Sequence, residues 1–160
     1  MHNKLQDPLA LVGRILLALM FVLAGASKIG DYAGTVGYMA AYHVPMPNVL
    51  AVSTIALELG GGLALVFGQY TRWAALALGL FTLLASFIFH PFWAVPADQA
   101  MVTNLLFMKN ISVAGGMFVL AAFGAGAFSL DAKRAHAVGH AELRGAVGHA
   151  AGGMKGALRS

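Results

Sequence analysis

The residue with the clearest chemical potential is Glu58, a carboxylate within the apolar stretch from Val52 to Phe67. A lone acidic side chain at the centre of a membrane helix costs roughly 2.5–3.5 kcal/mol on insertion scales. We therefore expect a cationic partner for Glu58 elsewhere in the chain. The candidates are Lys109 and then Arg14, which also lie in apolar stretches. Lys109 is preferred because it lies at a similar depth, counted at about 1.5 Å per residue.

Further polar side chains extend this pair into a predicted internal column. The predicted polar or ligand site consists of Arg14, Lys28, Glu58, His90, Lys109 and Asn110. Two interpretations stay open. The column is either an ion-pair network that fixes how the helices pack, or a site for a polar headgroup, a quinone or a proton. The second is the usual reason for ionisable residues inside a membrane.

Histidine and cysteine usage restricts the remaining chemistry. His90 can exchange a proton near neutral pH, but a lone histidine at a helix end is more typical of a hydrogen-bonding residue. A haem held by two histidines would need His43 as the second ligand, which we do not expect. His136 and His140 would bind a metal only in a helical tail, so no metal site is predicted. The chain has no cysteine, which excludes thiolate metal sites, disulfides and covalently attached c-type haem.

The composition places these residues in a membrane. Of the 160 residues, 59% are hydrophobic and only 10% are charged, whereas soluble domains carry about 25% charged residues. The apolar runs predict four membrane helices, over about residues 9–27, 49–67, 73–90 and 102–123. The net charge of +4 does not indicate nucleic-acid binding, because the basic residues stand at the ends of the apolar runs and in the tail.

We therefore expect an all-α integral membrane four-helix bundle. Between its first two helices, Asp31 can cap a short interfacial helix, which is either an ordinary loop helix or a lid over the polar site. A cleaved signal peptide is the alternative for the first run, but Arg14 within that run favours a retained helix. The helical spacing of Arg14, Ala18, Phe21, Gly25 and Lys28 places them on one face of it, which we expect to face the bundle.

The chain divides into a membrane domain of residues 1–131 and a tail of residues 132–160, rich in Gly, Ala and His and predicted to be flexible. Most basic residues fall on one side of the predicted bundle: Lys4, Arg14, Arg72, Lys133, Arg134, Arg144, Lys155 and Arg159. The positive-inside rule then puts both termini in the cytoplasm and the short helix on the periplasmic side of a bacterial inner membrane.

Several short motifs, in this order, resemble the DoxX family of small bacterial membrane proteins. They are Arg14 in the first helix, Ala24-Gly-Ala-Ser-Lys28, Tyr38-Met-Ala-Ala-Tyr42 before Pro45, Glu58-Leu-Gly-Gly-Gly62, Gly68 with Arg72, His90-Pro-Phe-Trp93, and Phe107-Met-Lys-Asn110 ahead of Gly115-Gly116. The resemblance covers about residues 9–131 and leaves the tail outside. It implies a four-helix inner-membrane protein. The family takes its name from a subunit associated with terminal quinol oxidase and thiosulfate:quinone oxidoreductase activity, and other members are linked to membrane oxidoreductase complexes.

The resemblance implies an accessory subunit of a quinone-linked membrane oxidoreductase, with quinone as the candidate cofactor. The expected partners are the lipid bilayer and an oxidoreductase subunit. Because the chain has no cysteine and no predicted haem pair, we do not expect it to carry electrons itself, and whether it is an enzyme stays open. Two alternatives come from other classes of protein: a small proton-coupled transporter, and a structural scaffold without a ligand.

Overall fold

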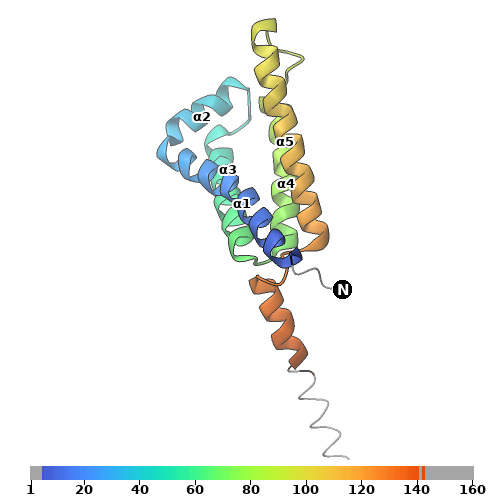
Figure 1. Cartoon of the computed structure of the whole chain (residues 1–160). Coiled ribbons are helices and arrows are strands. Elements are labelled where there is room, and N and C mark those ends of the chain that lie inside the picture. Colours follow the sequence, from blue (N-terminus) through green and yellow to red (C-terminus); the bar gives the residue numbers. More distant parts are fainter. Residues whose placement is uncertain (1–4, 141, 143–160) are drawn as a thin grey trace, which may run out of the picture.

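Four apolar stretches form long helices in a computed structural model of the chain, which describes residues 5–140 and 142. The labelled helices are α1 (Gln6–Gly30), α2 (Tyr32–Ala41), α3 (Pro47–Phe67), α4 (Thr71–Phe89) and α5 (Ala97–Phe123) (Figure 1). All of these except α2 are long and apolar enough to cross a membrane. The expected all-α four-helix membrane bundle, with a short helix between its first two spans, is therefore confirmed.

The helices extend beyond the apolar runs that predict them. α1 begins at Gln6 and includes Pro8 in its first turn. Proline is tolerated there because its missing N–H would have no hydrogen-bond partner within the helix. α5 begins directly after Pro96 and carries Asp98 in its first turn, where a carboxylate complements the helix dipole. Its 27 residues span about 40 Å, which exceeds a hydrocarbon core of about 30 Å.

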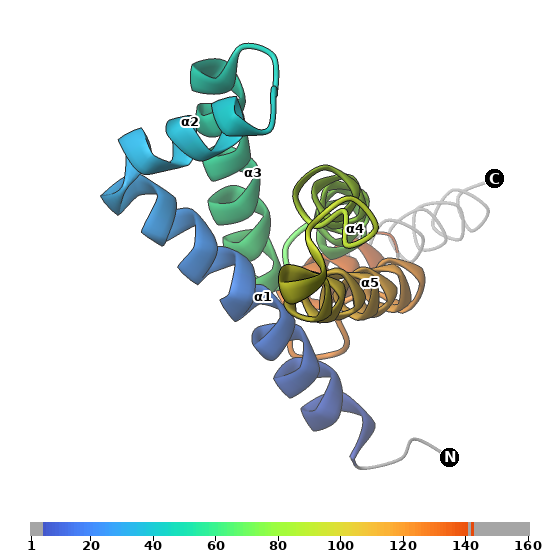
Figure 2. The same ribbon diagram turned by 90° about the horizontal axis from the view of Figure 1, so that it is seen from above.

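The helices are arranged as two pairs. α1 packs mainly against α3 and α4 mainly against α5, while contacts between α3 and α4 join the pairs. Seen from above, α1 runs obliquely across the molecule and α4 and α5 lie side by side (Figure 2). α2 lies against α3 and marks one end of the bundle, the α2 end. A helical segment over residues 130–140 follows α5 at the other, the tail end.

The first part of the predicted tail is helical. The sequence places a flexible segment over residues 132–160, and the structure shows a helix over residues 130–140. Except for Glu142, the rest of the predicted tail lies outside the described residues.

Glycines bring α1 and α3 together. A Cβ atom added to Gly62 would lie 2.8 Å from Cγ2 and 3.2 Å from the backbone nitrogen of Val22. One added to Gly25 would lie 2.7 Å from Cγ of Leu59. Small residues allow this close approach of two helices in a membrane. The inward face predicted for α1 is confirmed: four of its five residues, Arg14, Ala18, Phe21 and Gly25, are buried, and the fifth, Lys28, is half-buried.

Candidate functional site

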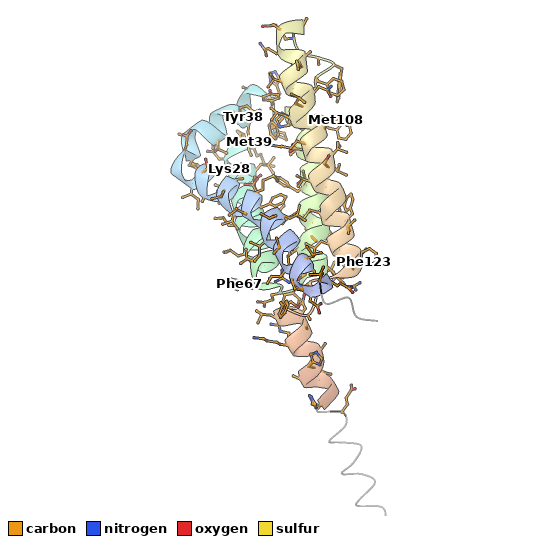
Figure 3. The ribbon with its side chains drawn as sticks, in the orientation of Figure 1. Lys28, Tyr38, Met39, Phe67, Met108 and Phe123 are labelled. Carbon is orange, nitrogen blue, oxygen red and sulfur yellow. The ribbon has the colours of Figure 1, made fainter. Side chains whose placement is uncertain are left out.

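A cavity of about 270 Å³ lies at the α2 end of the bundle. Each of the five labelled helices contributes at least one polar residue to it, and the residue after α4 contributes another. These residues are Lys28, Tyr38, Glu58, Thr82, His90, Lys109 and Asn110. Figure 3 labels Lys28 and Tyr38 at this end, with Phe67 and Phe123 at the other. The structure therefore brings five of the six predicted site residues together, and adds Tyr38 and Thr82.

Glu58 forms an ion pair with Lys28. The ammonium nitrogen of Lys28 lies 2.7 Å from one carboxylate oxygen of Glu58 and 2.9 Å from the other. The prediction that Lys109 is the first partner of Glu58 is wrong, and so is the second choice, Arg14. Depth along straight helices does not show which helices pack together, and α3 packs against α1 rather than α5.

Lys109, from α5, lines the same cavity. Among the residues that the structure describes, the only ion pair joins Lys28 and Glu58, so no described carboxylate lies within 4.0 Å of the Lys109 ammonium. Its charge acts on His90, which follows α4. Partial burial and then the charge of Lys109 lower the pKa of His90 below its usual 6.5. The cavity thus combines a neutralised ion pair with a cation that has no such partner.

α2 covers this end of the cavity with aromatic rings. The Tyr38 ring stacks on Phe89 at a centroid distance of 5.3 Å, and Tyr42 meets Phe89 edge-on at the same distance. Burial, together with the hydrogen bond and charge of Tyr42, raises the pKa of Tyr38 to about 12. Tyr38 therefore keeps its phenolic proton at neutral pH and can act as a hydrogen-bond donor.

Arg14 lies apart from this cavity, at the tail end. Its guanidinium donates hydrogen bonds to the backbone oxygens of Ala125, Phe128 and, at 3.5 Å, Val66. Arg14 is only 2% exposed. The prediction that Arg14 joins the polar column is not what the structure shows. Its guanidinium holds the chain after α5 against the end of α3, which identifies a structural role.

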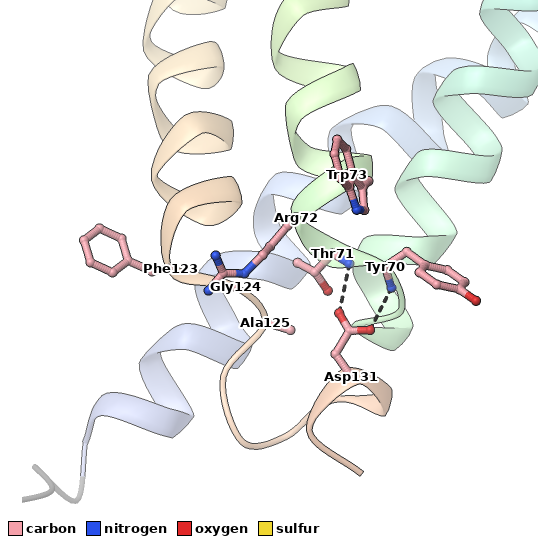
Figure 4. A pocket seen from close by; sticks show the side chains of 8 residues that line it. All are labelled: Tyr70, Thr71, Arg72, Trp73, Phe123, Gly124, Ala125 and Asp131. Atoms are coloured by element: carbon pink, nitrogen blue, oxygen red, sulfur yellow. Dashed lines mark hydrogen bonds between the residues drawn. The ribbon is translucent and has the colours of Figure 1, made fainter. Parts of the chain in front are cut away.

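A second polar cluster at the tail end was missed by the sequence reasoning. The Asp131 carboxylate accepts hydrogen bonds from the backbone N–H groups of Tyr70 and Thr71, at 2.8 and 2.9 Å (Figure 4). Partial burial acts to raise its pKa, but these bonds outweigh it and lower the pKa of Asp131. The bonds cap the first turn of α4 from 60 residues away in the chain, so no local motif signals them.

This cluster borders a cavity of about 360 Å³, which is larger than the one at the α2 end. Exposed aromatic side chains, Trp73 and Phe123, flank it beside Arg72 (Figure 4). Because its carboxylate already serves as a helix cap, we assign this region a structural role. Across residues 5–140 and 142, no three His, Asp or Glu side chains gather as a metal site would require.

Comparison with known proteins agrees with this architecture. The profile of the DoxX family matches residues 9–91, more than half of the chain. The chain belongs to the DoxX family. It is 46% identical to the inner membrane protein YqjF of Escherichia coli, over 81% of this chain and 94% of that protein. It is 35% identical to the inner membrane protein YphA of the same organism, over 78% of this chain and 89% of that protein.

A more distant relative comes from a eukaryote. The Surfeit locus protein 4 homolog of Schizosaccharomyces pombe is 28% identical over 83% of this chain, which corresponds to 39% of that protein. No solved structure matches the chain. The resemblance to the DoxX family is confirmed, and the chain is an integral membrane protein similar to bacterial inner membrane proteins.

Proposed function

We propose that this DoxX-family protein is an accessory subunit of a quinone-linked membrane oxidoreductase, and that the cavity at the α2 end holds the quinone headgroup. The observation that carries this proposal is the convergence of Lys28, Glu58, His90, Lys109 and Asn110 on one cavity. Ionisable side chains are costly within a membrane, so their gathering around a space favours a ligand.

The lining fits a quinone headgroup in its chemistry. A quinone ring is flat and apolar and carries carbonyl oxygens, which only accept hydrogen bonds. Lys109 and Asn110 supply donors around the cavity, while Phe21 and Phe81 supply apolar surface. A bound quinone would supply the redox chemistry, since the chain has no cysteine and relies on a partner subunit for electrons.

In this proposal the charged residues of the cavity have different roles. Lys109 donates to a carbonyl oxygen of the headgroup, which explains a cation without a described carboxylate partner. Glu58 fixes the Lys28 ammonium through two short contacts, so the pair forms a rigid wall of the cavity. His90, with its lowered pKa, remains neutral at pH 7 and adds no second positive charge beside Lys109.

The test is to extract the protein together with its surrounding lipid in polymer nanodiscs and to measure quinone per protein by mass spectrometry. We expect wild-type protein to be enriched in quinone relative to the bulk membrane, and Lys109→Met to lose the enrichment. Lys133→Met is the matched control, because Lys133 lies in the helix at the tail end, away from the cavity. Equal quinone content in wild type and Lys109→Met would overturn the proposal.

A proton-coupled transporter is the second candidate function. The observation that favours it is that two protonatable side chains, Glu58 and His90, line the same cavity. Proteoliposomes that contain a pH-sensitive dye would distinguish the two functions. A proton flux that Glu58→Gln abolishes, in protein without enriched quinone, would favour transport over the quinone site.

We also propose that both termini face the cytoplasm, so that the cavity opens toward the periplasmic side of the inner membrane. Arg72, Lys133 and Arg134 lie at the tail end, and such loop cations mark the cytoplasmic side. Fusion of alkaline phosphatase, which is active only in the periplasm, to the C-terminus should give an inactive enzyme. An active fusion would reverse this orientation.

A further inference from the structure

A second cavity lies beside the first, between α2, α3 and α4. Its volume is about 200 Å³. Most of its lining is apolar and includes Met39, Val44, Leu50, Leu57, Leu84 and Ile88. Of its two hydroxyl groups, that of Ser53 already donates to the carbonyl of Val49 at 2.9 Å. Because a polar group placed there would find few hydrogen-bond partners, the cavity suits a hydrocarbon chain.

One stripe of α4 separates the two cavities. Phe81, Ala85 and Phe89, spaced by four residues, line both. Ala85, at the centre of the stripe, presents only a methyl group, whereas the ring of Phe89 is held by Tyr38 and Tyr42 of α2. The narrowest side chain of the wall therefore lies midway between the polar cavity and the apolar one.

The volumes argue for one ligand across both spaces. Cavities that bind small molecules usually measure about 300–1,000 Å³. Neither the polar cavity, at about 270 Å³, nor the apolar one, at about 200 Å³, reaches that range alone, but the two together do. A ligand with a polar head and an apolar chain would match the division between them.

We infer that a prenylated quinone occupies both cavities, with its headgroup in the first and its chain passing Ala85 into the second. The inference rests on the proposed function and specifies its ligand as a chain-bearing quinone rather than a soluble one. The prenyl chain gains little free energy when it moves from lipid into the cavity, because lipid is equally apolar. Its effect is to orient the headgroup, so the test must report where the chain lies rather than how tightly the ligand binds.

The test uses a quinone that carries a photoreactive diazirine on its prenyl chain, added to the full-length protein in phospholipid nanodiscs. After illumination, peptide mass spectrometry locates the cross-links. We expect them at the apolar cavity, at Met39, Leu57 or Ile88. An excess of unlabelled prenylated quinone should reduce them to background.

A matched pair of variants separates the cavity from the lipid-facing surface. Ser53 lines the apolar cavity but not the polar one, so Ser53→Phe fills only the former. Ser112 lines neither of these two cavities, and its hydroxyl donates to the carbonyl four residues earlier, as that of Ser53 does. Both serines are exposed, so both variants should fold. We expect Ser53→Phe to lose the cross-links and Ser112→Phe to keep them.

Each outcome decides between the two proposals. Cross-links that spread over the lipid-facing surface and are unaffected by Ser53→Phe would overturn the assignment of the apolar cavity to the prenyl chain. If a quinone without a chain still competes with headgroup binding, the proposed function survives that result. Competition by phospholipid but not by quinone would assign the cavity to an acyl chain and overturn the inference. Quinone enrichment that is absent from the wild-type nanodiscs would overturn the proposed function itself.

Discussion

The ammonium of Lys28 bridges both carboxylate oxygens of Glu58, at 2.9 and 2.7 Å. The two residues come from α1 and α3, the same helices that approach closely at Gly25 and Gly62. The Glu58 side chain is 7% exposed and that of Lys28 is 27% exposed. The pair therefore joins two closely packed helices at the wall of the polar cavity, and its structural and functional contributions can be separated by mutation.

Removal of one partner should cost more than removal of both. Glu58→Leu leaves the Lys28 ammonium without a counter-charge, and we expect a loss of about 3 kcal/mol in the free energy of unfolding. The double variant Lys28→Met with Glu58→Leu should recover most of this loss, because neither charge of the pair remains. Unfolding in mixed micelles, titrated with sodium dodecyl sulfate, measures the difference.

A control pair tests whether Lys28 is the specific partner. Lys109→Met combined with Glu58→Leu should give no recovery beyond the sum of the single effects, since Lys109 is not paired with Glu58. If this control recovers stability and the Lys28 double variant does not, the pairing shown by the structure is wrong. Full quinone content in the Lys28 double variant would indicate that the pair serves only as a scaffold.

Two glycines of α3 should respond oppositely to alanine. At Gly62 a new Cβ would meet Val22 at 2.8 Å, including backbone contact at 3.2 Å, so we expect Gly62→Ala to lose about 1–3 kcal/mol. At Gly60 nothing lies within 4 Å of the new atom, so Gly60→Ala should be neutral or slightly stabilising. The same unfolding titration compares them, and equal effects would contradict the close α1–α3 contact.

The helices and their inward faces follow from sequence because the hydrophobic pattern is local. The period that joins Arg14, Ala18, Phe21 and Gly25 identifies the buried face of α1. Glu58 is likewise predicted as a buried charge from its position within one apolar run, and it is 5% exposed. Both inferences need only the chain within a single helix.

The partners of these charges could not be predicted in the same way. The identity of the cation beside Glu58 depends on which helices pack together and on how α1 tilts. The hydrophobic period of a single helix predicts neither. Long side chains add a further ambiguity, because Lys28 reaches from near the end of its helix toward Glu58. Arg14 and Asp131 bind backbone groups more than 50 residues away, and such contacts carry no sequence signature.

Asp131 should make the free energy of unfolding depend on pH in the acidic range. Its pKa is lowered from the usual 3.8 in the folded state, so its contribution is present above that value and is lost as the pH falls through the lowered pKa. Asp131→Asn should remove this dependence and cost about 1 kcal/mol at neutral pH, because a charged cap of α4 is lost. Hydrogen exchange at the amides of Tyr70 and Thr71 reports the effect directly. Unchanged protection of both amides would contradict the cap.

The effect of the Lys109 charge should be measurable as a change in the pKa of His90. Burial and then Lys109 lower the pKa of His90, so Lys109→Met should raise it toward 6.5, with burial alone still holding it below that value. Because the folded-state pKa is the lowered one, the contribution of His90 to stability is present above 6.5 and declines as the pH falls through the folded-state value.

This decline in stability should begin at the same pH in both proteins but end at a higher pH in Lys109→Met, because the folded-state pKa of His90 is higher in that variant. Nitrogen NMR of histidine-labelled protein measures the pKa directly. A His90→Gln sample assigns the resonance, and Lys133→Met controls for the loss of a distant charge. An identical midpoint in wild type and Lys109→Met would show that the ammonium points away from His90.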